Sequence, residues 1–279
     1  MPALSQIKKD IEFYQGLHSL LKVLKGIAIS QYHMWEKKLQ PFEVFSHYIE
    51  GFLGGINLEE INHPFIIPPT KTLAVVAVTS DAGLLGGLNR EIVNRALDEI
   101  KEGGVFIVVG ERGKLYAQGR VKEVVAFEGI KDDTKFNQAI ELRNYLIGEL
   151  VNGRIGVVKI VYPRAYSLAV QRIEKEILLP YGLKEKESYL QLEDFILESS
   201  IERIVEYLVF LWLGRKLYDI FNMSRLAEFA ARFLHLEECT QKLEDMDQKL
   251  KFKYFRLQHE ITDRSIREIF AGRLNYGYR

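Results

Sequence analysis

The sequence is poor in residues that build covalent or metal-based frameworks. Its 279 residues include one cysteine, Cys239, so neither an intrachain disulfide framework nor a cysteine-rich zinc site is possible. The six histidines form no His-x-x-x-His pair, the commonest helical zinc motif. We therefore expect no metal site.

The sequence also lacks an excess of charge of either sign. Lys plus Arg and Asp plus Glu both number 38, which gives a formal net charge of +0 at pH 7. Proteins that bind nucleic acid over a broad surface neutralise phosphates with an excess of Lys and Arg. The balance therefore predicts no nucleic-acid partner.

No apolar run is long enough to cross a membrane. The densest run, Tyr207–Leu213, falls far short of the roughly 20 residues that a spanning helix needs. The first ten residues contain no apolar stretch of the kind found in secretory signals. We expect neither a direct membrane span nor a signal peptide, so any role at a membrane depends on a partner.

Residues 1–57 are predicted to form a coiled-coil helix. Apolar residues recur every seven positions, and a companion row fills the seam. Pro41 interrupts the pattern, and Gly54-Gly55 ends it. The first row is Ile7, Tyr14, Leu21, Ala28 and Trp35, and the companion row includes Leu17 and Leu24.

Residues 72–195 are predicted to form an α/β domain. Continuous apolar runs, typical of strands covered on both faces, alternate with stretches of helical character. Strand, helix, strand, helix, strand predicts a small Rossmann-like layered domain. The strands are expected at Leu73–Val78, Val105–Val109 and Ile155–Tyr162, and the helices at Leu88–Lys101 and Lys135–Val151.

Residues 196–279 return to the seven-residue period. No proline follows Pro180, so residues 202–270 can form one helix about 100 Å long at about 1.5 Å per residue. The main row is Phe229, Leu236, Leu243, Leu250 and Leu257; the companion row begins at Leu226 and Phe233, shifts one place at Cys239 and Met246, and resumes at Tyr254 and Ile261.

The two helical zones are expected to pair as a long antiparallel coiled coil with the α/β domain inserted between them. Neither seam can be buried without a partner helix, and each zone is the nearest partner of the other. Two independent core helices of a helical domain are the alternative.

A glycine-rich loop, Thr79–Asn89, follows the first strand and opens a helix, where phosphate loops sit. A P-loop needs Lys-Ser or Lys-Thr after its last glycine, but this loop has Leu88-Asn89. The Gly-x-x-Gly-Gly spacing also differs from the dinucleotide fingerprint. A tight structural turn is therefore favoured, and the alternative is a nucleotide- or anion-binding α/β enzyme that uses the Gly83–Gly87 loop.

The same loop resembles the Ser-Asp-x-Gly-Leu-x-Gly-Gly-Leu-Asn signature of the gamma subunits of F-type ATP synthases. Arg is common in that family where this chain has Ala82. The matching residues are Ser80, Asp81, Gly83, Leu84, Gly86, Gly87, Leu88 and Asn89.

Shorter stretches extend the resemblance over nearly the whole chain. Leu21–Ala28 is similar to a segment of the family's first helix and keeps its two lysines, Lys22 and Lys25. The C-terminal end departs from the family, with one extra residue and Leu257 in place of an arginine. Further matches are Gln40-Pro41-Phe42, Leu178-Leu179-Pro180, Glu228, Arg232, Thr240, Gln258, Ile261, Thr262, Glu268, Ile269 and Gly272.

The resemblance implies a central rotor shaft, not an enzyme. It implies partners in the alpha and beta subunits around the coiled coil, the epsilon subunit beside the α/β domain, and the membrane ring of c subunits. It implies no catalytic residue and no cofactor, and for a prokaryotic source it implies the cytoplasmic face of the cell membrane. The residues expected to contact partners are Lys22, Lys25, Arg232, Arg256 and Gln258.

Two features bear on how such a shaft would meet its partners. The basic and aromatic stretch Lys249–Arg256 suits either nucleic acid or acidic loops of a surrounding protein sleeve, and zero net charge favours the sleeve.

A coiled-coil adaptor outside the family is a third class of function. Five aromatic residues are expected to exceed what one seam can hide and to form a partner surface: Phe229, Phe233, Tyr254, Phe255 and Trp35.

Overall fold

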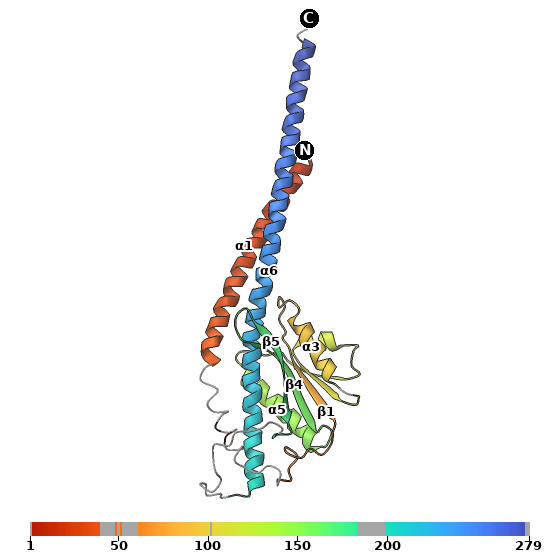
Figure 1. Ribbon diagram of the computed structural model, residues 1–279, viewed down its shortest axis with the longest axis vertical. Coiled ribbons are helices and arrows are strands. Elements are labelled where there is room, and N and C mark those ends of the chain that lie inside the picture. Colours follow the sequence, from red (N-terminus) through yellow and green to blue (C-terminus); the bar gives the residue numbers. More distant parts are fainter. Residues whose placement is uncertain are drawn as a thin grey trace. The chain divides into compact units, whose positions relative to one another are not determined.

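The computed structural model describes residues 2–39, 48, 51, 61–100, 102–182 and 199–276 (Figure 1). The chain divides into two compact units. One contains residues 29–232, and the other joins residues 1–28 with residues 233–279. The predicted interruption at Pro41, the helix end at Gly54-Gly55, and the domain boundaries at 57 and 195–196 lie outside the described residues.

The larger unit is built on a five-stranded sheet in the order β3-β2-β1-β4-β5. The first four strands are parallel, and β5 pairs antiparallel with β4. Parallel neighbours need crossover connections, which here contain helices. The strands are β1 (Leu73–Val78), β2 (Val105–Val109), β3 (Val124–Phe127), β4 (Val157–Ala165) and β5 (Gln171–Leu179), and the helices between them are α3 (Leu88–Glu99), α4 (Glu111–Ala117) and α5 (Lys135–Val151).

Both faces of the sheet are covered, which explains the continuous apolar runs. Every residue of β1 is buried, and successive side chains alternate between two cores. Val75 and Ala77 pack with residues of α3, whereas Ala74, Val76 and Val78 pack with α5.

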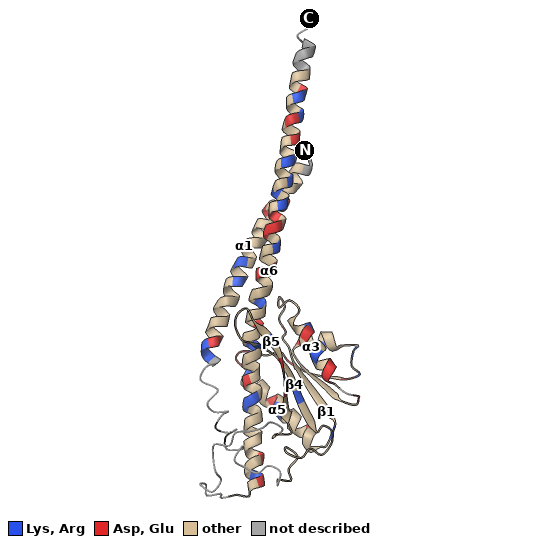
Figure 2. Cartoon of the chain, in the orientation of Figure 1, with Lys and Arg blue, Asp and Glu red and all other residues tan. Residues whose placement is uncertain are grey.

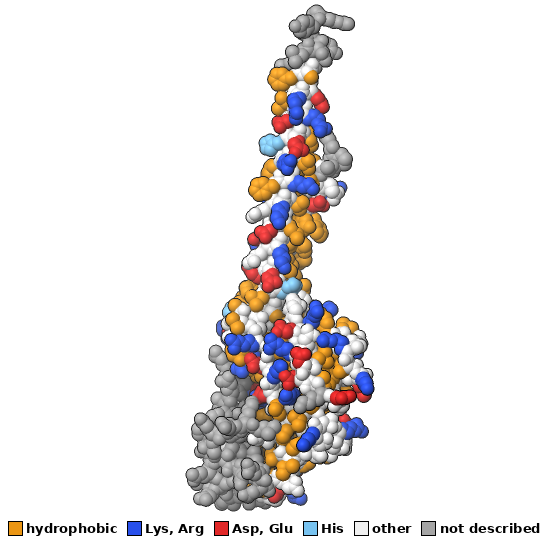
Figure 3. All heavy atoms as spheres, turned by 45° about the vertical axis from the view of Figure 1, so that its right-hand side comes forward, with side chains coloured by type: hydrophobic (Ala, Val, Ile, Leu, Met, Phe, Trp, Pro, Cys, Tyr) orange, Lys and Arg blue, Asp and Glu red, His pale blue; other side chains and the backbone are white. Residues whose placement is uncertain are grey.

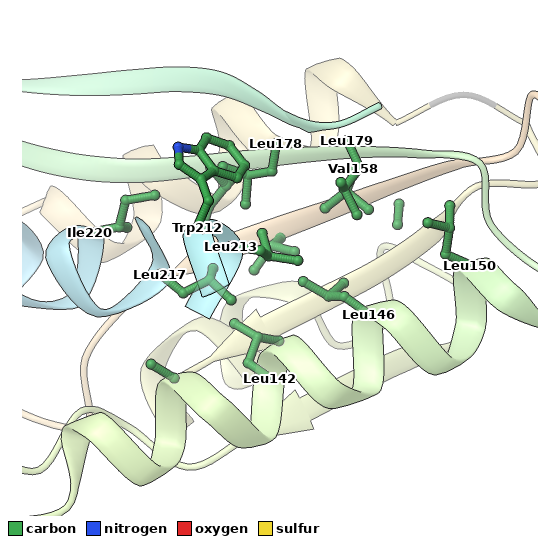
Figure 4. Close-up of a cluster of buried hydrophobic side chains, with 14 of the residues drawn as sticks. Leu142, Leu146, Leu150, Val158, Leu178, Leu179, Trp212, Leu213, Leu217 and Ile220 are labelled. Atoms are coloured by element: carbon green, nitrogen blue, oxygen red, sulfur yellow. The ribbon is translucent and has the colours of Figure 1, made fainter. Parts of the chain in front are cut away.

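The second core also includes the beginning of the C-terminal helix, α6 (Ile201–Tyr276). Leu142, Leu146 and Leu150 of α5 lie opposite Trp212 and Leu213 of α6 in Figure 4. Residues 205–221 of α6 therefore supply part of the core beneath the sheet.

Helix α1 (Pro2–Leu39) and α6 are the longest helices among the described residues. The 76 residues of α6 make it about 114 Å long at about 1.5 Å per residue, which confirms the expected single C-terminal helix. On α1 the residues of the predicted rows are buried or half-buried, with Ile7 7% and Ala28 0% exposed.

In the smaller unit α1 and α6 run side by side in opposite directions. Lys25 contacts Glu237, and His18, one heptad earlier on α1, contacts Glu244, one heptad later on α6. Leu236 and Leu243 of the main row are buried, and Leu250 and Leu257 are half-buried.

The companion row differs from the prediction at two positions, Cys239 and Met246. Met246 is 48% exposed, and the next residue, Asp247, takes its place beside α1. Thr240 is buried, while Cys239 is only half-buried. The row therefore keeps a strict seven-residue spacing. The predicted row shifted by one residue at two places because the residues that keep the spacing there, Thr240 and Asp247, are polar. The members of the row are Phe233, Thr240, Asp247, Tyr254 and Ile261.

The predicted aromatic partner surface is partly wrong. Phe229 is 1% exposed and Trp35 4% exposed, because they pack together with Tyr32, Leu226 and Ala230 inside the larger unit. Phe233 and Tyr254 are half-buried, and of the five only Phe255 is exposed, at 55%.

Candidate functional site: the glycine loop and the charged helix faces

The glycine loop lies between the carboxyl end of β1 and the start of α3, and its polar side chains bind one another. The Ser80 backbone N–H donates to Asn89 Oδ1 at 3.2 Å, and Asn89 Nδ2 donates to Ser80 Oγ at 2.9 Å. Ser80 and Asn89 are 2% and 8% exposed. The first and last residues of the signature thus close the loop on itself.

The next residue, Asp81, holds the loop to the following crossover. Its Oδ1 accepts a 2.7 Å hydrogen bond from the backbone N–H of Glu111, in the first turn of α4. A carboxylate at a helix N-terminus satisfies a free N–H and interacts favourably with the helix dipole. Gly129 approaches Asp81 so closely that an added Cβ would collide with the carboxylate.

Of the three signature glycines, Gly86 has the conformation that favours glycine, with φ 58°. Gly87 has φ −89°, and Gly83 has room for a Cβ beside Arg112. Leu84 also adopts a positive φ, 62°. Of the three, Gly86 is therefore the glycine that the turn requires, and the polar groups of Ser80, Asp81 and Asn89 are engaged by the protein itself.

The two lysines of α1 that were expected to contact partners, Lys22 and Lys25, occupy different positions. Lys25 lies at the contact with α6, where its Nζ donates to Glu237 Oε2 at 2.5 Å. That hydrogen bond lowers the pKa of Glu237. Lys22 is exposed.

Arg232 lies on α6 in a cluster of charged residues within the larger unit. Its guanidinium is 5.7 Å from the Phe229 ring centroid, and burial lowers its pKa. Arg225 donates to Glu228 at 2.6 Å and to Asp132 at 2.9 Å. Burial raises the pKa of Glu228 to about 7 despite the neighbouring arginines.

Arg256 and Gln258 both lie on the exposed side of α6. Arg256 pairs with Glu260 on its own helix at 3.2 Å. Four of the five predicted contact residues thus belong to the smaller unit and Arg232 to the larger one. They do not converge on one site, and their contact with partners stays a prediction.

The sequence analysis anticipated neither of the two buried cations among the described residues, Lys135 and Arg143. Lys135, the first residue of α5, is 8% exposed, and its Nζ lies 3.5 Å from the centre of the Trp35 ring. Burial lowers its pKa to about 8. The seven-residue row predicted that Trp35 is buried. No feature of the sequence around Lys135 predicts that a lysine at the start of a helix packs against it.

A second missed feature was visible in the sequence. Phe13, Leu20 and Ile27 of α1 recur every seven residues outside the seam, with Val23 between them. They are 67%, 53%, 49% and, for Val23, 61% exposed. We call these four residues the outer stripe of α1.

Charges of both signs accompany this apolar surface. Lys and Arg interleave with Asp and Glu along α6 in Figure 2. On the face drawn in Figure 3, charged side chains of both signs alternate with apolar ones along the helical unit. Such a mixed face differs from the single-sign surface of a nucleic-acid binder.

The described part of the chain contains neither a candidate membrane span nor a candidate metal site. No helix there is long and apolar enough to span a bilayer. Nor do three or more His, Cys, Asp or Glu side chains gather there in a way that could hold a metal ion.

Comparison with known proteins gives one family throughout. A family model described as ATP synthase matches residues 3–273. An ATP synthase gamma chain of Pelotomaculum thermopropionicum is 23% identical, with 98% of each chain covered. One of Clostridium perfringens is 25% identical, with 96% of each covered.

Solved structures share the fold. The match to the rotor of the Euglena gracilis mitochondrial ATP synthase has a TM-score of 0.69 at 15% identity, covering 94% of this chain and 99% of the other. The match to the central stalk and c ring of the Tetrahymena thermophila enzyme has a TM-score of 0.60 at 17% identity, covering 79% and 99%. The chain belongs to the ATP synthase family, and within it to the gamma subunits, the central stalk of F-type ATP synthase.

Proposed function

We propose that this chain is the rotating shaft that couples ion-driven rotation of a membrane ring to ATP synthesis or hydrolysis at alpha and beta subunits. Its terminal helices form an antiparallel coiled coil, and a Rossmann-like α/β domain is inserted between them. The observation that carries the proposal is α6, a 76-residue helix shared by both units in a chain that matches the family from residue 3 to 273.

The shaft acts without chemistry of its own. The polar side chains at the glycine loop are engaged by the protein itself, so the enzyme alternative is not favoured. The subunit is non-catalytic and needs no cofactor, because nucleotides bind to its partners. Coupling is a free energy that links shaft angle to nucleotide affinity, and it requires different contacts at each angle.

The contacts of the shaft with its partners follow from the surface. Exposed apolar patches mark partner surfaces, and the outer stripe of α1 is such a patch. Lys22, Lys25, Arg232, Arg256 and Gln258 supply polar contacts to the enclosing alpha and beta subunits. The α/β domain meets the epsilon subunit and the c ring, at the cytoplasmic face of the membrane in a prokaryotic cell.

Reconstitution with purified alpha and beta subunits of the same organism tests the proposal. We expect a stable complex with one copy of this chain, whose ATPase activity falls when α6 is truncated after Lys249. A matched control replaces the exposed residues Phe252 and Ile266 with serine and keeps the helix length. Failure of the folded chain to join the complex, or unchanged activity after truncation, would refute it.

A further inference from the structure

One layer of the α1–α6 seam is polar on both helices. On α6 it contains Asp247, which occupies a row otherwise filled by Phe233, Thr240, Tyr254 and Ile261. The Asp247 side chain is 18% exposed, and its Oδ2 pairs with Lys251 at 2.5 Å. Its Oδ1 is buried without a hydrogen-bond partner.

Thr240, the other polar residue of the row, differs in this respect. Its hydroxyl donates a 2.7 Å hydrogen bond to the Leu236 carbonyl, so this buried donor has a partner within its own helix. A buried acceptor without a partner loses its hydration and receives nothing in return. Asp247 is therefore the destabilising member of the row.

Packing is also incomplete at this layer. A cavity of about 250 Å³ opens between the helices, lined by four residues of α1 and three of α6. Atoms around a void lose the contacts that close packing supplies. The lining residues are Tyr14, Gln15, His18, Ser19, Leu243, Glu244 and Asp247.

The α1 side of the layer has weak helical propensity. Gly16 lies among these residues, and a Cβ added there would meet nothing within 4 Å, so packing does not require glycine. Glycine is the poorest helix former after proline. A hydrogen bond crosses the layer, between His18 Nε2 and Glu244 Oε1 at 2.7 Å.

The neighbouring part of the pair is packed conventionally. Ala28 and Leu236 are fully buried, and the Lys25–Glu237 ion pair spans the helices. Toward the N-terminus, Ile7 is again buried at 7% exposed. The weak layer thus separates the first turns of α1 from the well-packed stretch.

We propose that this layer, the polar notch formed by Tyr14, His18, Ser19, Glu244 and Asp247, is a built-in opening point of the helical pair. Residues 4–19 of α1 separate from α6 there, while residues 20–28 stay paired. An isolated helix of about 16 residues is marginal in water. The separated segment therefore loses protection of its backbone amides, which makes the opening measurable.

Hydrogen exchange of the full chain, followed by mass spectrometry, tests the notch. We expect a step in protection, with residues 4–19 exchanging at least tenfold faster than residues 20–28. Asp247→Leu removes the unpaired acceptor and adds apolar volume beside the cavity, so exchange in residues 4–19 should slow about tenfold, which corresponds to about 1.4 kcal/mol. Asp245→Leu, an equal change at an exposed position of the same helix, should leave it unchanged.

Ordinary fraying from the helix end makes the opposite prediction. It gives a smooth gradient of exchange from residue 4 to residue 28 and no response to Asp247→Leu, and either result would overturn the notch. Should Asp247→Leu fail to fold, Gly16→Ala strengthens α1 at the same layer. Slower exchange confined to residues 4–19 in Gly16→Ala would support the notch, and equal slowing through residue 28 would overturn it.

Discussion

The polar groups of Ser80, Asp81 and Asn89 form hydrogen bonds with the protein's own backbone and with one another. A loop that follows a strand and opens a helix is well placed for an anion, yet here it fastens β1 to α3 and α4. The missing lysine after the glycines predicted this outcome from sequence. The bond from Asp81 to Glu111 was beyond reach, because it joins residues 30 positions apart.

Replacing Asn89 with alanine tests the structural role of the loop. The change leaves the buried Ser80 N–H without its acceptor, so we expect the free energy of unfolding to fall by about 1–3 kcal/mol. Urea titration measures it. Arg90→Ala, at the adjacent exposed position, should change the value by less than about 0.5 kcal/mol. Equal effects of the two substitutions would argue against a structural role for the Ser80–Asn89 hydrogen bonds.

Two lysines, Lys38 and Lys135, lie over the Trp35 ring, and their replacement should affect stability differently. Lys135 is buried 3.5 Å from the ring centre, whereas Lys38 is exposed at 4.9 Å. Lys135→Met keeps the apolar stem and removes a charge that burial disfavours, so we expect stability at pH 7 to be unchanged or to rise by up to about 1 kcal/mol. Lys38→Met should have little effect.

The pH dependence of stability separates these two lysines. The pKa of Lys135 falls from 10.5 to about 8 on folding, so between those values the unfolded chain binds more protons. The free energy of unfolding should therefore rise with pH in that window in the native chain and in Lys38→Met, and the rise should shrink in Lys135→Met. An unchanged slope in Lys135→Met would contradict the burial of this charge.

At the scale of elements, the apolar patterns of the sequence predicted the strands and helices correctly where burial follows a regular pattern. Leu73–Val78, Val105–Val109 and Lys135–Val151 coincide with β1, β2 and α5. The predicted order omitted α4, β3 and β5. Strand β5 was missed because an antiparallel edge strand with one exposed face carries alternating charges rather than an apolar run. The predicted row also placed Met246 in the seam, since apolar periodicity cannot anticipate a row that accepts Asp247.

The outer stripe of α1 gives the prediction that belongs to this scale. Leu20 and Ile27 are 53% and 49% exposed, so replacing both with serine should barely change the thermal melting of the isolated chain. It should weaken binding to alpha and beta subunits, because apolar area buried in the complex is lost. Titration calorimetry measures the affinity. Serine at Lys8 and Glu12, exposed on the same helix, is the matched control.

A stripe that matters only for folding would give the reverse pattern. Lost stability with normal affinity in the double serine variant would contradict a partner surface on α1. The same loss of affinity in the Lys8 and Glu12 control would point to a general effect of the substitutions instead.

At the scale of the whole molecule, α6 is the element that both units share. Its residues 201–232 belong to the unit of the sheet, and residues 233–276 belong to the helical pair. The length of α6 could be predicted from the absence of proline after Pro180, but its share in the sheet's core could not, because that packing joins residues far apart in sequence.

Direct observation of rotation tests the central claim. A complex of this chain with alpha and beta subunits is fixed to a surface through beta, and a bead is attached to a cysteine at exposed Lys122, with Cys239 replaced by serine. The account predicts that ATP drives the bead in one direction, and that it stops when ATP is removed. A complex that hydrolyses ATP at its normal rate while the bead stays still would contradict it.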